Sequence, residues 1–257
     1  MQAHCGSFPR CVGVRGKRWA MSTGNDIAAV VAAHNEEAGV AQVVSGLLSV
    51  LPDGCEVLVV DDGSEDRTAQ RAEEAGARVL RLKPNRGKGA ALRAGISATE
   101  AEILVFIDAD GQDEPAELPV LLEAMASDVA LVIGSRFLGT LEDGSIKALN
   151  LVGNKCLTGL FNLLYGARIT DTQAGFRVLR RSAIRLEELR ARRYEIETEM
   201  TLHVLRRGGR VVEVPVTRRA RAGGQTGFEI AYDGLRILSC MLTSRLASFR
   251  GRGGSDR

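Results

Sequence analysis

The stretch EILVFIDADGQDEPAELPVLLEAMAS, residues 102–127, contains a strand, an acidic turn and a helix in immediate succession. Its first part is a continuous apolar run from Ile103 to Ile107, which is typical of a strand covered on both faces. Its last part starts at Pro115, a residue favoured in the first turn of a helix. Between them lie four acidic residues: Asp108, Asp110, Asp113 and Glu114. Carboxylates this close repel one another, so the turn predicts that positive charge is bound nearby.

The same alternation of strand and helix extends outward from this stretch. Apolar runs predict further strands within residues 27–33, 55–60, 77–82 and 129–136. Helical periodicity predicts helices within residues 38–51, 66–74 and 87–99. Strands that are apolar throughout and joined by helices predict a parallel sheet covered on both faces. The fold class is therefore α/β, with a Rossmann-like, mainly parallel sheet and helices on both faces.

The pattern changes after Arg136. Helices are expected at residues 147–166, near 180–189 and at 195–207, and a strand at 210–221. Residues 228–250 predict an amphipathic C-terminal helix, because apolar residues recur in steps of three and four. These are Phe228, Ala231, Leu235, Leu238, Leu242, Leu246 and Phe249, interleaved with Arg236, Arg245 and Arg250.

Composition is that of a soluble globular protein, with 45% hydrophobic and 26% charged residues. No apolar run reaches the ~18 residues of a membrane span. Residues 1–24 are expected to be a disordered leader, with Met21 as an alternative start, and residues 251–257 a disordered tail. The five cysteines form no CxxC pair, which argues against zinc and favours buried, reduced thiols.

Charge is distributed unevenly along the chain. Residues 1–146 carry 13 Lys and Arg against 22 Asp and Glu, whereas residues 147–257 carry 21 against 10. This asymmetry favours an acidic, metal-handling half and a basic half that meets anions, although two solvated faces without a function would show it too.

Polar clusters follow four of the predicted strands. They lie at residues 34–37, 61–64, 108–112 and 135–136. Ligands of open α/β sheets bind beyond the carboxyl ends of the strands, so these clusters predict one shared crevice.

The pair Asp108 and Asp110 is a candidate metal site. Two aspartates separated by one residue can both approach a hard cation through oxygen, and Gln112 adds a neutral oxygen within reach. A bare DxD is more often an acidic loop or a helix cap. Its place after an apolar strand, beside three other polar clusters, favours Mg²⁺ or Mn²⁺ here.

Two further segments fit a ligand-binding role and a simple turn equally well. In Asp61-Asp62-Gly63-Ser64 a carboxylate could accept from the N–H groups of a nucleobase, or the segment could be a capped turn. The basic, Gly-rich NRGKGAAL, residues 85–92, could contact phosphate or form a tight turn, and it lacks the P-loop spacing.

Taken in order, these motifs resemble family 2 glycosyltransferases of the GT-A fold, specifically the dolichyl- or polyprenyl-phosphate hexose synthases. The resemblance runs from about Ile27 to Thr226. AAHNEE resembles the family's PxYNEE, VVDDGSEDRT its DDGSxDxT, NRGKGAALRAGI its NxGKGxAxxxG, and DADGQ its metal motif. The segments GSR, DTQAGFRVL and VPVTRRARAGGQT follow in the usual order.

The resemblance implies a GT-A catalytic domain over residues 25–227 and assigns roles within it. Nucleotide-sugar binding falls to Ala32, His34, Glu36, Val60, Asp62, Lys88, Asp108 and Ala109. The metal ligands are Asp108, Asp110 and Gln112. The acceptor phosphate is met by Arg136, Arg218, Arg219 and Arg221. The catalytic residues are Asp110, Arg136 and Asp171.

The sequence departs from the family pattern at two places. Ala32 and His34 replace the usual Pro and Tyr, which puts the base contact in doubt. Gly227 stands where a basic residue is often found, and Thr226 replaces Ser. Acceptor binding is therefore expected to depend more on the arginines at 218, 219 and 221.

The implied activity is inverting, metal-dependent transfer of a hexose from GDP-mannose or UDP-glucose to a polyprenyl or dolichyl phosphate. The second pKa of a lipid phosphate is near ~6, so it is largely anionic at pH 7 and needs no strong general base. A sugar hydroxyl acceptor would need one, and Asp171 is then the best candidate, unless it only caps a turn.

The implied location is cytoplasmic, peripheral to the inner face of the membrane, directly or through a membrane-anchored partner. The C-terminal helix could lie in the membrane interface or pack on the domain. No nucleic-acid partner is expected. The alternatives are a family 2 enzyme with a sugar or small soluble acceptor, a nucleotidyltransferase, and a non-catalytic nucleotide-sugar binding module.

Overall fold

The computed structural model describes residues 26–221, 223 and 227–252. The expected leader at residues 1–24, the alternative start Met21 and residues 253–257 of the expected tail lie outside this part, as does Thr226.

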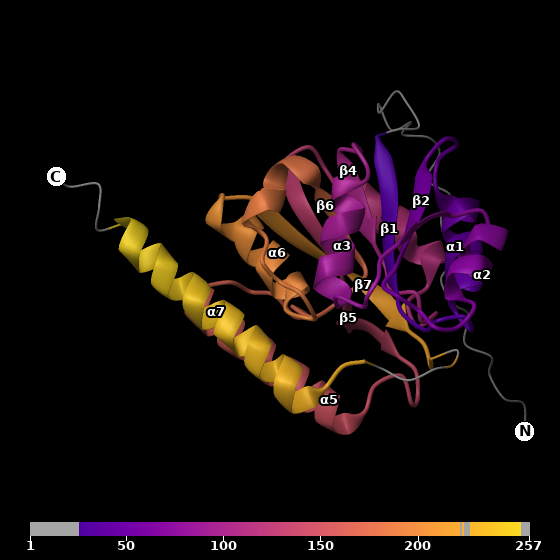
Figure 1. Cartoon of the computed structure of the whole chain (residues 1–257). Helices are drawn as coiled ribbons and strands as arrows, with labels where there is room; N and C mark the ends of the chain where they lie inside the picture. Colours follow the sequence, from indigo (N-terminus) through magenta and orange to yellow (C-terminus); the bar gives the residue numbers. More distant parts are fainter. Residues whose placement is uncertain (1–25, 222, 224–226, 253–257) are drawn as a thin grey trace, which may run out of the picture.

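A seven-stranded sheet forms the centre of the molecule, in the order β3-β2-β1-β4-β6-β5-β7 (Figure 1). All pairings are parallel except those of β6, which runs antiparallel to both β4 and β5. The α/β, mainly parallel sheet predicted from the apolar strands is confirmed. The strands are β1 Ile27–Ala33, β2 Glu56–Asp61, β3 Arg78–Arg81, β4 Ile103–Phe106, β5 Val129–Leu141, β6 Arg177–Arg180 and β7 Arg210–Arg218.

Helices cover both faces of this sheet, because alternate side chains of the central strands point to opposite faces. Val31 packs into one core cluster with α1 and α4, whereas Val30 packs into the other with α3 and α6. The α-helices are α1 Val40–Val50, α2 Thr68–Glu74, α3 Lys88–Ser97, α4 Leu118–Ala124, α5 Ala148–Tyr165, α6 Ile196–Arg206 and α7 Ile230–Arg252.

The segment after the fourth polar cluster differs from the prediction. Residues 177–180, for which no strand was predicted, form β6 in the middle of the sheet. The helix expected near 180–189 is wrong, since only the single 3₁₀ turns η2 Arg181–Ala183 and η3 Leu186–Glu188 form. The buried residues Ile184 and Leu189 are five positions apart, so one continuous helix could not turn both toward the core.

The predicted C-terminal helix is present as α7, which reaches two residues beyond its expected end. It packs against α5 and α6, and α5 and α7 lie side by side at the edge of the molecule (Figure 1). Ile237 and Met241 are buried in the core, and Asp233 accepts hydrogen bonds from Arg193 Nε at 2.7 Å and from the backbone N–H of Glu229. None of the described helices combines the length and the apolarity needed to cross a membrane.

The three cysteines in the described residues are free, as expected for reduced thiols. The expectation that they are buried is wrong for Cys156, which is exposed on α5 and lines an open hollow between α5 and α7, and Cys55 and Cys240 are only half-buried.

Candidate active site

The loops after β1 and β2 are tied together at the carboxyl edge of the sheet. The backbone N–H of Asn35 donates to Ser64 Oγ at 3.0 Å, and that of Glu36 donates to Thr68 Oγ1 at 2.8 Å. Asn35 has a φ of +55°, a left-handed conformation that asparagine tolerates better than most residues. These contacts place His34, which is exposed, and Glu36 beside the end of β2.

The Asp62 side chain is not free, because it is hydrogen-bonded to the Gly-rich loop that precedes α3. Its carboxylate accepts from the backbone N–H groups of Arg86 at 2.9 Å and Gly87 at 2.7 Å, and it is only 3% exposed. Gly87 has a φ of +91°, and a Cβ there would lie 2.4 Å from the carbonyl oxygen of Arg192. A base contact by Asp62 would therefore use the lone pairs that these two hydrogen bonds leave.

Lys88 begins α3 and bridges two carboxylates. Its Nζ lies 2.5 Å from Asp108 and 2.7 Å from Glu197 of α6. Burial alone would raise the pKa of Asp108, but Lys88, Arg218 and Arg136 lower it to about 2. Burial would likewise lower the pKa of Lys88, yet Asp108 and Glu197 raise it above its ordinary value. Asp108 is therefore held as an anion beside a fixed cation.

Glu197 is the member of this group that sequence reasoning missed. It is 3% exposed on the first turn of α6. A signal was available, because EIETEM places three glutamates, at positions 195, 197 and 199, within an otherwise apolar helical pattern. Charged residues are seldom buried unless they are paired, so such a run indicates buried partners.

Asp110 faces two arginines, one at the end of β7 and one in the segment that follows it. Arg221 Nη1 lies 3.0 Å from its Oδ2, and Arg218 Nη2 lies 3.5 Å from the same oxygen. Arg221 also contacts Glu36. Burial raises the pKa of Glu36 to about 7, against the lowering effect of Arg221, and the carboxylates of Asp110 and Asp108 add to the rise.

Both polar atoms of the Gln112 side-chain amide are hydrogen-bonded. Its Oε1 accepts from Arg218 Nη2 at 2.8 Å, and its Nε2 donates to the carbonyl oxygens of Ser145 and Arg219 at 2.9 and 3.0 Å. If Gln112 binds a cation, it shares that oxygen with Arg218.

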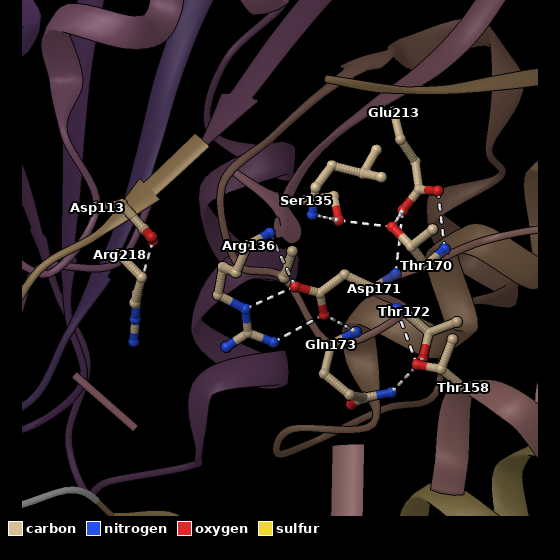
Figure 2. A network of polar contacts seen from close by, with 12 residues as sticks. Asp113, Ser135, Arg136, Thr158, Thr170, Asp171, Thr172, Gln173, Glu213 and Arg218 are labelled. Atoms are coloured by element: carbon tan, nitrogen blue, oxygen red, sulfur yellow. Dashed lines mark hydrogen bonds and ion pairs between the residues drawn. The ribbon is translucent and has the colours of Figure 1, made fainter. Parts of the chain in front are cut away.

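Arg218 lies beneath the acidic turn and is 9% exposed. It pairs with Asp113 at 2.9 Å, and Figure 2 shows this pair. Arg219 points outward, pairs with Glu114 at 2.5 Å and keeps 47% of its side chain exposed. Of the four arginines expected to meet the acceptor phosphate, Arg219 and Arg221 are thus reachable from solvent, whereas Arg136 and Arg218 are mainly enclosed.

Arg136 and Asp171 form a buried two-point ion pair (Figure 2). Arg136 Nε and Nη2 each lie 2.7 Å from a different oxygen of Asp171, which is fully buried. Burial would lower the pKa of Arg136, but Asp171 raises it. Glu213 of β7 fixes the Asp171 loop, because it accepts from the backbone N–H groups of Thr170 at 2.8 Å and Asp171 at 3.0 Å.

The remaining predicted residues are less accessible. Val60 is fully buried, and its side chain faces Gly95 of α3, so any ligand contact there would have to come from the backbone. Ala109 is 2% exposed and packs against Gly39, where a Cβ would lie 2.6 Å from the Ala109 carbonyl oxygen. Ala32 is half-buried at the end of β1.

The residues present fit a hard divalent cation that is only partly held by protein. In the described part of the chain no group of three or more His, Cys, Asp or Glu side chains is placed to hold a metal. Asp108 and Asp110 offer carboxylate oxygens from one short turn. Mg²⁺ is commonly bound by one or two carboxylates together with substrate phosphates, which matches this donor set.

This fold and site define an α/β protein of the GT-A type, and comparison with known proteins gives its family. Residues 28–186 match the model of glycosyl transferase family 2, so the chain belongs to that family and is a glycosyltransferase.

Three relatives carry informative names. The chain is 31% identical over 201 residues to a dolichyl-phosphate hexose transferase of Haloferax volcanii, covering 78% of this chain and 86% of that one. It is 32% identical to an undecaprenyl-phosphate mannosyltransferase of Micrococcus luteus, covering 77% and 85%. It is 30% identical to a polyprenol monophosphomannose synthase of Mycolicibacterium smegmatis, covering 86% and 89%.

A solved structure confirms the fold. Glucosyl-3-phosphoglycerate synthase from Mycobacterium tuberculosis, in complex with Mn²⁺, UDP and glucosyl-3-phosphoglycerate, superimposes with a TM-score of 0.71. The match covers 86% of this chain and 80% of that one at 24% identity. At that identity the likeness concerns the fold alone.

Proposed function

We propose that this enzyme transfers a hexose from a nucleotide-diphosphate sugar to a polyprenyl phosphate, with inversion at the sugar C1 and with Mg²⁺ or Mn²⁺ as cofactor. The observation that carries the proposal is that one edge of the sheet presents two charge environments. The acidic pair Asp108 and Asp110 suits a metal diphosphate, and the basic residues Arg136 and Arg221 suit a second anion. The names of the relatives support a lipid-phosphate acceptor.

The donor side is built around Asp108 and Asp110. A divalent cation bound there would act as a Lewis acid that neutralises the leaving nucleoside diphosphate. Lys88 keeps Asp108 ionised and oriented through its 2.5 Å contact. Asp62 fixes the loop at residues 86–87, and His34 and Glu36 line the side where the nucleotide would lie.

The acceptor side needs positioning more than proton transfer. A phosphate monoester that is already anionic can attack without a general base, but its approach to the donor diphosphate is opposed by charge repulsion. Arg136 and Arg221 would offset this repulsion and align the two substrates. Since both oxygens of Asp171 are bonded to Arg136, we assign Asp171 the role of orienting that guanidinium.

The pair α5 and α7 offers a surface for the membrane that holds such an acceptor. Six apolar side chains on these two helices are exposed, and together we call them the α5–α7 face. They are Leu149, Val152, Leu163, Leu235, Leu242 and Leu246. They recur at helical spacing, and a hollow of about 530 Å³ between the helices is lined mainly by apolar residues, together with Asn150 and Asn154. An amphipathic surface of this kind suits peripheral association with the inner face of a membrane.

A transfer assay tests the proposal. The purified chain is incubated with Mg²⁺ or Mn²⁺, a short polyprenyl phosphate and labelled GDP-mannose or UDP-glucose in parallel. Labelled sugar in the organic phase that disappears with EDTA is the expected result. Donor hydrolysis or nucleotide binding without lipid product would instead favour a soluble acceptor, which is the alternative function.

A further inference from the structure

A second hollow lies on the outer side of α3, the helix seen at the front of the sheet in Figure 1. Its volume is about 820 Å³, within the range of small-molecule sites. It is bounded by the loop after β3, by the solvent side of α3 and by η3. Three arginines from three separate segments line it: Arg86, Arg93 and Arg192.

These arginines are not compensated by acids. Arg86 makes one long hydrogen bond, from Nη2 to the carbonyl oxygen of Lys83 at 3.4 Å. Within the residues that the structure describes, no salt bridge joins a carboxylate to Arg86, Arg93 or Arg192. The one acid in the lining is the exposed Glu187, so the lining carries an excess of positive charge.

Other arginines near this side of the sheet have partners. Arg78 pairs with Glu56, Arg81 with Glu73, and Arg185 with Glu188. Arg93 differs most from them, because its Nε is buried and has no hydrogen-bond acceptor among the described residues. A buried donor without an acceptor is costly, so an acceptor supplied by a ligand would remove that cost.

The other residues that line the hollow indicate the chemical character of that ligand. Leu82, Ala90, Ala94 and Leu186 give the hollow an apolar floor, and Asn85 and Ser97 add neutral polar groups. Arginine binds phosphate through two parallel hydrogen bonds and is favoured where that anion is recognised. We propose that this hollow is a binding site for an organic phosphate, with its phosphate on the three arginines and its apolar part on the floor.

The hollow is separate from the donor crevice but shares one loop with it. Ala90, Arg93, Ala94 and Ser97 recur at helical spacing along the outer face of α3, away from the strand ends. The backbone N–H of Arg86 donates to Asp62, whereas its side chain lines the hollow. The two sites are therefore expected to be occupied at the same time.

The test uses the full chain, labelled with ¹⁵N-arginine, and inorganic phosphate as the first probe. The Nε–Hε resonance of Arg93, assigned with Arg93→Gln, is followed by NMR during two phosphate titrations. One titration contains EDTA and no nucleotide, and the other contains Mg²⁺ and a saturating amount of GDP or UDP. AMP is then titrated in the nucleotide-saturated sample as an organic phosphate probe.

A saturable shift of the Arg93 resonance is expected in both titrations, with tighter binding of AMP than of phosphate. Arg192→Gln should weaken phosphate binding about tenfold, the loss expected for one charge-assisted hydrogen bond. Arg71→Gln, on the exposed side of α2, is the matched control and should leave the affinity unchanged, because α2 packs into the core on the opposite face of the sheet from α3.

Three results would overturn the proposal: no saturable shift of Arg93, an equal affinity in Arg192→Gln and wild type, or loss of the shift when the nucleotide saturates the donor crevice. The EDTA titration needs neither nucleotide nor sugar transfer. A failure of the proposed function therefore leaves this test intact.

Discussion

Arg136 is fixed by Asp171 through two hydrogen bonds of 2.7 Å in a buried pair. The two residues are 35 positions apart and come from β5 and from the loop before β6. The pair gives the candidate site a cation whose orientation is fixed, because the planar guanidinium matches the carboxylate at two points.

Asp171→Asn tests whether Asp171 positions Arg136 or acts as a base. Loss of the charge leaves Arg136 buried without a counter-ion, so the free energy of unfolding should fall by about 3 kcal/mol. Turnover should drop roughly 100-fold as Arg136 loses its orientation. The remaining activity is measured as kcat/KM from pH 6 to 9, and its pH profile should have the same shape as that of wild type.

A base would behave differently in that experiment. If Asp171 removed a proton, the acidic limb of the profile would disappear in Asp171→Asn. Asp128→Asn, which breaks the exposed pair with Arg210, is the control for charge loss and should change neither stability nor activity appreciably.

Asp110→Ala tests the metal assignment. Metal-dependent donor binding and turnover should be abolished, because one of the two carboxylates of the turn is removed. The fold should persist, since Arg218 keeps Asp113 and Arg221 keeps Glu36 as partners. Calorimetry with and without Mn²⁺ measures metal-dependent donor binding, and a thermal melt followed by circular dichroism measures whether the fold persists. Full metal-dependent activity in this variant would show that the cation is held elsewhere.

Glu36 should make the stability of the metal-free protein depend on pH. Its pKa is raised from 4.5 to about 7 in the folded state, so the folded chain binds a proton that the unfolded chain has lost in that range. The stabilisation from protonated Glu36 is full below pH 4.5 and is lost as the pH rises through 7. Allowing for solvent screening, the change should be about 1–2 kcal/mol.

The measurement compares wild type with Glu36→Gln by urea unfolding in EDTA at pH values from 4.5 to 8. As the pH rises, the free energy of unfolding of wild type should fall relative to that of Glu36→Gln. A constant difference would mean that Glu36 titrates near its ordinary value, with Arg221 offsetting its burial.

The α5–α7 face should govern membrane binding. Leu163→Asp and Leu235→Asp each place a charge on a strongly exposed leucine, 81% and 67% exposed in the present structure. Each should reduce co-sedimentation with anionic vesicles at least fivefold, because burying a charge in the interface is costly. Val120→Asp, 50% exposed on α4, is the matched control. Equal vesicle binding by all four proteins would assign membrane contact to another surface.

Much of the fold was predictable because its signals are local. The apolar runs of β1, β2, β4 and β5 and the periodicity of α7 depend only on neighbouring residues. The antiparallel strand β6 was not predictable, since its four residues, two of them arginine, become a central strand only by pairing with β4 and β5.

The sequence by itself determined the class of site, because DADGQ and the other strand-end motifs place oxygen and basic groups at one edge of a parallel sheet. Only the tertiary structure decided how those groups are paired. Arg221 meets Asp110 across 111 positions, Lys88 meets Glu197 of α6, and Arg136 meets Asp171. Such pairs depend on how distant elements pack, and burial makes each charge require a partner that no local pattern specifies.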